Sequence, residues 1–529
     1  MRALLACLLV LGVGCGGASR LVEIPPLDEE VDRVEGTDPD AVAAPAPYPP
    51  DAHAQAGLVE LPSASPMVSL RVTFDAGSVE DPPERAGLTE LMARVMTGGA
   101  AGERSATDVQ QTLYPWAGEL RAVTGRDATT FVGRVHRDHL EPFTELFLDV
   151  LLRPRFTTED VDRLRAQQRS ELLLGLRAND DESLGKELLH QLLYEEHPYA
   201  LPPLGTASGL DAATAGELRA HAARILCPGR MRGGVSGDVP EGYGAALLTR
   251  LEARDGEACL GRRQLPPAPA QARRVLIADK PAASAVAMSL GLATRVTRDH
   301  PDYPALTLAM AYLGQHRTFA GTLMQKIRGE RGLNYGDYAY AEHFVQEGWT
   351  RFPAPGFPRR QQYVSLWVRP VDAAQAHFAL RLAVHELERV VRDGLTEEEL
   401  ERIRGFARRY YALYLQTDAR RLGFALDDRA YDAPEPFLEG LRAGWATLSA
   451  AEVNAALRRH VDPATLQIAL VAPDAAALAA ALVAGDPSPR TNREASDPDV
   501  QAEDARVARH DLRLEEGDVR VVPVASLFE

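Results

Sequence analysis

The sequence predicts an α+β protein made of two homologous halves. Two pairs of segments repeat in the same order along the chain, residues 156–165 with 395–404 and residues 214–218 with 449–453. Repeats in one register indicate a duplicated body, because each half then holds the same elements in the same order. We assign an N-terminal lobe to residues 56–245 and a C-terminal lobe to residues 273–485.

The second pair of repeats predicts a helix start in each half. Thr214 and Ser449 stand three residues before Glu217 and Glu452. A Ser or Thr followed at this distance by Glu forms a capping box, in which each side chain accepts a hydrogen bond from a free backbone N–H group. A proline and an apolar alternation follow in both halves, which predicts a strand after each helix.

Hydrophobic periodicity predicts further elements. Apolar alternation indicates strands over residues 68–74 and 363–368, and a helical period covers residues 374–392. Gly394 follows that helical pattern, and glycine is the usual residue where a helix ends.

Length and charge exclude several classes of protein. A chain of 529 residues exceeds the size that one hydrophobic core usually supports. Its 45% apolar and 25% charged residues are ordinary for a globular protein. The net charge of −17 argues against a nucleic-acid partner, because such a partner requires a basic face.

The N-terminus resembles an export signal. Residues 1–20 have a short charged start, a short apolar run and then small residues around Cys15. The run before Cys15 resembles a bacterial lipobox, which implies that this cysteine is acylated and becomes the mature N-terminus. The alternative is simple secretion with an incidental cysteine. Residues 21–55 are rich in proline and acid, which predicts a tether without a core of its own.

Two other segments lie outside the predicted lobes. Residues 246–272 contain several prolines and are expected to connect the lobes. Residues 486–529 carry mixed charge, so we expect a mostly flexible tail whose apolar last residues dock on the body. Only Cys227 and Cys259 remain besides the cysteines of the signal, which is too few for a disulfide framework or a metal cluster, and their spacing leaves their pairing open.

Residues 323–335, Leu-Met-Gln-Lys-Ile-Arg-Gly-Glu-Arg-Gly-Leu-Asn-Tyr, resemble the substrate-gripping helix and turn of the insulinase/pitrilysin family of metallopeptidases. Shorter matches occur in the family's order at residues 75–78, 151–156, 197–199 and 301–303. The likeness spans about residues 56–485. It implies two homologous lobes, each a pair of related α/β units with antiparallel-rich sheets and flanking helices. It also implies that the lobes close as a clamshell around a peptide chamber, where an extended substrate binds as an added strand.

The resemblance also locates a zinc site that this chain has lost. Active members carry H-x-x-E-H on a helix, with two histidine ligands one turn apart and a glutamate base between them. Here Glu90 and Arg94 replace the histidines, and Ala93 replaces the base. Arginine has no lone pair to give to a metal. We therefore expect no metal in this chain, and zinc only in a partner subunit.

The third zinc ligand of the family is a distant glutamate, and Glu171 follows Arg94 at the interval that the family shows. We expect Glu171 to form an ion pair with Arg94 in place of the metal. The alternative is that Glu171 faces solvent. His136 and His139 form the one close histidine pair, and they lack the spacing of helical ligands, so we expect them at a strand end on the surface.

Arg328 and Tyr335 stand where the family places an Arg and a Tyr that reach toward the scissile peptide. Both side chains donate hydrogen bonds suited to carbonyl oxygens and developing negative charge. The alternatives are a solvated arginine and a core tyrosine. Residues 340–360 form an aromatic-rich insert that is either a binding flap or a packed surface loop.

These features together favour a non-catalytic subunit of a two-chain metalloendopeptidase. The chain would bind a peptide or unfolded protein, form a heterodimer with a zinc-bearing homologue and supply Arg328 and Tyr335 to that zinc site. Alone it is expected to be inactive. A stand-alone peptide-binding or scaffold lipoprotein is the alternative. The lipid anchor would place the protein in the bacterial cell envelope, at the periplasmic face of the outer membrane.

Overall fold

The structure is a computed structural model that describes residues 57–253, 258–269, 271–432, 436–490 and 497–529. The predicted signal segment, the predicted acylation site Cys15 and the predicted tether over residues 21–55 lie outside the described residues. Within the described ranges, no helix combines the length and the apolar character needed to cross a bilayer.

The first sheet has five strands in the order β1-β5-β2-β4-β3. Its strands are β1 (Leu58–Pro62), β2 (Met67–Phe74), β3 (Glu119–Thr124), β4 (Thr129–His136) and β5 (Met231–Gly237). β1 and β5 are parallel, and the other neighbours are antiparallel. β3 stands at one edge of this sheet.

The second sheet repeats the same pattern and adds one strand. Its order is β11-β6-β10-β7-β9-β8, so that five of its strands follow the order of the first sheet. The strands are β6 (Arg274–Asp279), β7 (Val286–Thr294), β8 (Asp337–Tyr340), β9 (Gln362–Val371), β10 (Gln467–Ala472) and β11 (Val519–Pro523). β6 and β10 are parallel, as β1 and β5 are. The predicted mixed fold of two homologous lobes is confirmed.

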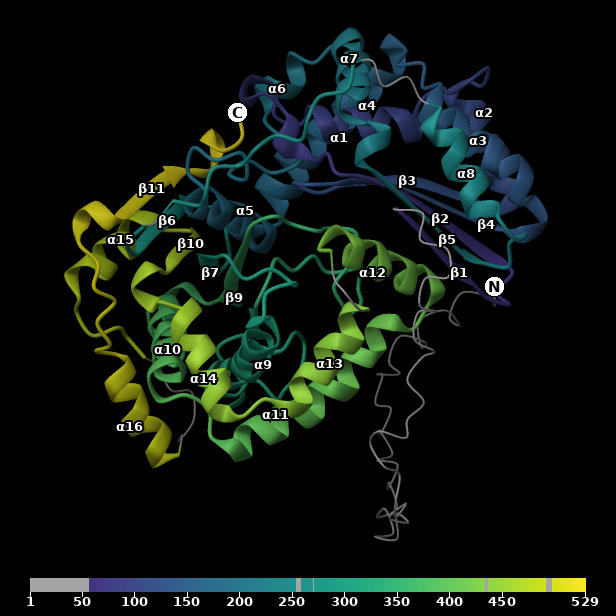
Figure 1. The fold of residues 1–529 in the computed structure, drawn as a ribbon. Helices are drawn as coiled ribbons and strands as arrows, with labels where there is room; N and C mark the ends of the chain where they lie inside the picture. The colour runs from purple at the N-terminus through teal and green to yellow at the C-terminus, as the bar shows by residue number, and fades with distance from the viewer. Residues whose placement is uncertain (1–56, 254–257, 270, 433–435, 491–496) are drawn as a thin grey trace, which may run out of the picture. The chain divides into compact units, whose positions relative to one another are not determined.

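The helices repeat as well (Figure 1). The first half contains α1 (Leu88–Gly98), α2 (Ala106–Leu113), α3 (Leu140–Leu152), α4 (Thr158–Ser170), α5 (Asp181–Leu193), α6 (Ala207–Asp211), α7 (Ala215–Ile225) and α8 (Tyr243–Glu252). The second half contains α9 (Tyr303–Gly314), α10 (Ala373–Asp393), α11 (Glu397–Tyr410), α12 (Asp418–Ala430), α13 (Phe437–Thr447), α14 (Ala450–His460) and α15 (Ala475–Ala484), followed by α16 (Pro498–Val507). α1 packs against β3, α4 and α7, and α9 packs against their counterparts β8, α11 and α14.

Each half lends one helix to the sheet of the other half. α5 packs on β7 and β10 of the second sheet, and α12 packs on β1, β2 and β5 of the first (Figure 1). On α5 the buried leucines Leu184, Leu188 and Leu192 repeat at the four-residue spacing of one helical face. They share a core with Leu276 and Val471 of the second sheet. This exchange brings side chains of α5 to the second-half strand β9.

Several local predictions are confirmed. Capping boxes start α7 at Thr214 and α14 at Ser449. α10 ends at Gly394, whose φ of 77° is a conformation that glycine adopts at little cost. β4 ends at His136, as expected for the histidine pair.

The segment after residue 485 corrects a prediction, because its described part is ordered and not a flexible tail. It forms α16 and β11, and β11 pairs with β6 and so covers an edge that would otherwise be open. Val507 and Leu512 are buried in the second-half core, and Phe528 is buried in the core that contains the first sheet. The burial of Phe528 agrees with the expected docking of the last apolar residues, whereas the mixed charge of the segment concealed the anchors Val507 and Leu512.

The connector also differs from its expected bounds. α8 ends at Glu252 and therefore crosses the boundary set at residue 246. Cys227, at the end of α7, forms a disulfide with Cys259 of the connector. The disulfide therefore fixes the connector at Cys259 to the first half.

Candidate functional site

A cavity of about 820 Å³ holds the positions expected for the zinc site. Side chains of α1, α5, the edge strand β3 and β9 line it, together with the loop between β8 and β9. Glu90, Arg94 and Glu171 are among its lining residues. The sequence-predicted positions of the lost metal site therefore lie at the wall of one chamber.

A buried carboxylate fixes the start of α1. Asp81 accepts hydrogen bonds from the backbone N–H groups of Gly87 and Thr89, at 3.0 and 2.9 Å. Gly87 has a φ of 97°, and a Cβ there would meet the carbonyl oxygen of Leu204 at 2.8 Å. The turn therefore requires glycine, and it sets the direction in which α1 carries Glu90 and Arg94.

A buried amide aligns α4 with α1. The Nε2 atom of Gln168 donates to the carbonyl oxygens of Gly87 and Leu204, at 3.1 and 3.0 Å. Glu171 follows one turn later, where the helix changes to a π-helical segment over Glu171–Ala178. Such wide turns are frequent at functional sites.

Arg94 joins the two carboxylates. Its Nε atom donates to Oε1 of Glu90, and its Nη1 atom lies 2.8 Å from Oε2 of Glu171. Burial alone would lower the pKa of the Arg94 guanidinium, but Glu90 and Glu171 outweigh that effect and raise the pKa. The expected pairing of Arg94 with Glu171 is confirmed.

Arg328 and Tyr335 lie together, but they do not line this cavity. The Nη1 atom of Arg328 donates to the carbonyl oxygen of Tyr335 at 3.1 Å, and the guanidinium carbon is 5.3 Å from the centre of the Tyr335 ring. The same guanidinium is 4.9 Å from the ring of Phe319. Tyr335 is 76% exposed and Phe319 is 68% exposed, so this pair is not part of the core.

Ion pairs with α16 fix the turn that carries Arg328. Arg328 lies in a second π-helical segment, Met324–Gly329. Just beyond it, the fully buried side chain of Arg331 forms ion pairs with Glu503 and Asp504 of α16, at 2.6 and 2.7 Å. The ordered C-terminal segment thus fixes the position of the Arg328 turn.

The loop over residues 341–361 reaches into the cavity and across to the first half. Phe344, Trp349 and Phe357 line the cavity. Arg360 forms an ion pair with the buried Asp127 of the first half at 2.7 Å. This segment therefore packs against the first half, as one of the two alternatives expected, and it also forms part of the cavity wall.

Sequence reasoning missed one group of cavity residues. The Nζ atom of Lys186 on α5 stands 3.3 Å from the centre of the Trp367 ring on β9. Arg369, two residues further along β9, forms a two-pronged ion pair with Glu182, at 3.1 and 3.0 Å. No local motif marks these residues, because they meet only through the packing of α5 on the second sheet.

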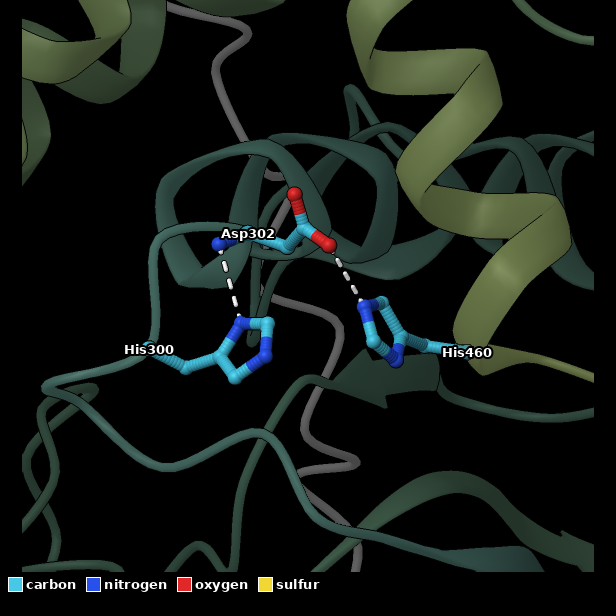
Figure 2. Close-up of side chains that lie close together, drawn as sticks. All are labelled: His300, Asp302 and His460. Atoms are coloured by element: carbon cyan, nitrogen blue, oxygen red, sulfur yellow. Dashed lines mark hydrogen bonds and ion pairs between the residues drawn. The ribbon is translucent and has the colours of Figure 1, made fainter.

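One cluster in the described part of the chain has the residue types of a metal site (Figure 2). Ligand atoms of His300, Asp302 and His460 lie within 4.8 Å of one another. However, Oδ2 of Asp302 accepts hydrogen bonds from His460 and from Arg459, each at 2.6 Å, and Nδ1 of His300 accepts from the backbone N–H of Asp302 at 3.0 Å. These groups satisfy one another and tie the start of α9 to the end of α14.

Comparison with known families agrees with the two-lobe architecture. The model for insulinase (peptidase family M16) matches residues 58–207, and the model for the peptidase M16 inactive domain matches residues 212–405. The chain belongs to the insulinase family. An uncharacterized zinc protease of Mycobacterium tuberculosis is 26% identical over 359 residues, which are 67% of this chain and 76% of the relative.

Other insulinase relatives and solved structures are more distant. The mitochondrial-processing peptidase subunit alpha of Homo sapiens is 28% identical over 131 residues, 25% of each chain. A peptidase M16 inactive domain from Pseudomonas fluorescens has a TM-score of 0.68 at 21% identity, covering 78% of this chain and 94% of that one. A protease from Helicobacter pylori has a TM-score of 0.65 at 16% identity, covering 79% and 97%. The two structures support the fold.

The residues at the positions predicted for the zinc site do not fit a zinc ion. Zinc takes imidazole, thiolate or carboxylate ligands, and a guanidinium offers none of these. Arg94 instead places a fixed positive charge between the two carboxylates. Ala93, at the position of the base, is fully buried in the core and cannot activate water.

Proposed function

We propose that this protein is a zinc-free, peptide-holding subunit that works with a zinc-bearing homologue of the insulinase family. The observation that supports this proposal most strongly is the ion pair of Arg94 with Glu171, because the cation takes the place of the metal while the chamber around it is retained. An arrangement that keeps the chamber and loses the metal suits substrate holding better than independent hydrolysis.

The edge strand β3 supports peptide binding. β3 is the last strand of the first sheet, and its residues Ala122, Val123 and Thr124 line the cavity. An open sheet edge offers backbone N–H and C=O groups to an extended peptide, which can bind as an additional strand. We infer that the substrate is extended, as a short or unfolded chain is.

The exposure of Arg328 and Tyr335 favours a role toward a second subunit. Their side chains lie outside the lining of this chain's own cavity, while Tyr335 and its neighbour Phe319 are exposed. Fixed donors of this kind stabilise developing negative charge on a carbonyl oxygen. A relative whose name describes one subunit of a processing peptidase adds a parallel for a two-chain arrangement.

Reconstitution tests the two-chain proposal. The purified chain should cleave no peptide alone and should restore cleavage when mixed with a zinc-bearing homologue from the same organism. Arg328→Ala and Tyr335→Phe should each lower the restored rate by about 10²-fold, the cost of removing one oxyanion donor. Arg392→Gln, which removes an exposed charge on α10, serves as the control.

Full restored activity in both site variants would exclude Arg328 and Tyr335 from the reaction. Peptide binding by the chain, together with failure of a zinc-bearing homologue to restore cleavage, would favour the stand-alone scaffold instead.

We also propose that Cys15 carries a lipid that holds the protein in the bacterial cell envelope. The disulfide between Cys227 and Cys259 supports an oxidising compartment, in which such bonds persist. Metabolic labelling with a radioactive fatty acid should label the wild-type chain and leave Cys15→Ser unlabelled. A fully labelled Cys15→Ser chain would refute acylation at this residue.

A further inference from the structure

Lys186 is an unusual basic residue in this chain. Of the 58 Lys and Arg residues, only three are lysines. Lys280 forms an ion pair with Asp181, and Lys326 forms ion pairs with Glu330 and Glu503. Within the described residues, the Nζ atom of Lys186 forms neither a hydrogen bond nor an ion pair, and its close contact is the face of Trp367.

The acidic residues of the cavity are already engaged. Arg94 forms ion pairs with Glu90 and Glu171. Arg369 forms an ion pair with Glu182, and Arg126 forms one with Glu187. Asp180 accepts a hydrogen bond from the backbone N–H of Ser183 at the start of α5. Each of these carboxylates therefore has another hydrogen-bonding partner, and Asp180, Glu182 and Glu187 attract the charge of Lys186 without forming an ion pair with it.

Trp367 holds the ammonium group without neutralising it. An aromatic face attracts a cation, but it accepts none of the ammonium hydrogen bonds in the way that a carboxylate does. The Nζ atom of Lys186 carries three donors, and only one side of it is covered by the ring. Arg317, whose Nη1 donates to the carbonyl oxygen of Trp349 at 3.4 Å, adds a second positive charge to the same wall.

We propose that Lys186, seated on Trp367, forms a subsite for a carboxylate of the bound peptide. The carboxylate is either an acidic side chain or the C-terminus of the peptide, since both present the same group. This inference rests on the proposed peptide-binding function and names a specificity-determining residue for it. A preference for negative charge is notable in a chain whose net charge is −17, because the protein as a whole repels such a ligand.

The protonation of Lys186 gives the subsite a pH dependence. Burial lowers the pKa of Lys186 to about 8. The lysine is therefore mostly charged at pH 7 and mostly neutral at pH 9, so carboxylate binding should weaken over this range. The charged or titratable groups that face it are Asp180 just before α5, Glu182 and Glu187 of α5, Arg369 of β9, His316 after α9 and His343 after β8.

Fluorescence anisotropy with three labelled peptides of equal length tests the subsite on the full chain. The first has one central Glu and an amidated C-terminus, the second has Gln and an amidated C-terminus, and the third has Gln and a free C-terminal carboxylate. We expect the Glu peptide, the free-acid peptide or both to bind about tenfold more tightly than the uncharged one, as for one charge-assisted hydrogen bond. The tighter of the two charged peptides identifies the source of the carboxylate.

Variants assign that preference to Lys186. Lys186→Met should lose it, Lys186→Arg should keep it and should also keep it at pH 9, and Arg392→Gln should behave as wild type. Equal binding of all three peptides, or an unchanged preference in Lys186→Met, would overturn the subsite while leaving peptide binding intact. Failure of all three peptides to bind would overturn the proposed function together with the subsite.

Discussion

The Nη1 atom of Arg94 lies 2.8 Å from Oε2 of Glu171, and the same guanidinium bonds with Glu90 one turn back on α1. Three positions that the sequence resemblance assigns to the zinc ligands are therefore linked by charge in this chain. The pair also connects α1 to the π-helical segment after α4, so it contributes to the structure of the chamber wall.

A double-mutant cycle measures this connection. Arg94 and Glu171 are partly exposed, and exposed pairs contribute only about 0.2–1 kcal/mol. Arg94→Gln and Glu171→Gln should each lower the free energy of unfolding in urea, and the double variant should lose less than the sum. Strictly additive losses would show that the two side chains do not interact in solution.

Arg331 should matter more for stability than any exposed ion pair. Its side chain is fully buried between Glu503 and Asp504, and removal of one partner from a buried charge network costs about 3–5 kcal/mol. We expect Arg331→Met to lower the free energy of unfolding by this order, and to increase hydrogen exchange in residues 324–335. Arg392→Met removes an exposed arginine and should change neither quantity. An Arg331→Met chain as stable as wild type would contradict the bracing role of α16.

Asp337, two residues after Tyr335, should make stability depend on pH. Burial raises its pKa to about 8, whereas an unfolded chain ionises near pH 4. Between these values the folded state binds more protons than the unfolded state, so the free energy of unfolding decreases as pH rises.

Asp337→Asn removes this dependence. Relative to wild type, the variant should gain about 1 kcal/mol or more at pH 8 and little at pH 4, as measured by urea unfolding at each pH. Asp299→Asn, a substitution of an exposed acid, is the control. A variant whose stability follows that of wild type across this range would show that Asp337 ionises normally.

The disulfide between Cys227 and Cys259 should stabilise the first half. It closes a loop with a sequence separation of 32, for which restriction of the unfolded chain contributes about 4 kcal/mol. The Cys227→Ser/Cys259→Ser chain should therefore unfold at lower denaturant concentration, and a reducing agent should shift only the wild-type curve. Identical curves in oxidised and reduced wild type would argue against the bond.

Local signals predicted part of this structure well. Capping boxes marked α7 and α14 because Thr214 with Glu217, and Ser449 with Glu452, interact within one turn. The pairing of Arg94 with Glu171 was also predicted, since the family pattern fixes the interval between these residues.

Long-range packing was not visible in the sequence. Lys186 meets Trp367 only because α5 crosses to the second sheet, and no spacing along the chain reports that exchange. Glu503 and Asp504 lie in the segment predicted to be mostly flexible, because their partner, Arg331, is far away in sequence and no local pattern reports the contact. Charge pattern alone does not distinguish a buried ion pair from a surface one.

Metal analysis of the purified full-length chain tests the central claim most directly. The protein is prepared without chelators, incubated with zinc and freed of the excess before mass-spectrometric metal determination. The zinc content should be far below one equivalent, because the guanidinium of Arg94, at a predicted zinc-ligand position, cannot bind the metal. One zinc per chain that is lost in Glu171→Gln and kept in Arg392→Gln would contradict the account and identify a metallopeptidase complete in itself.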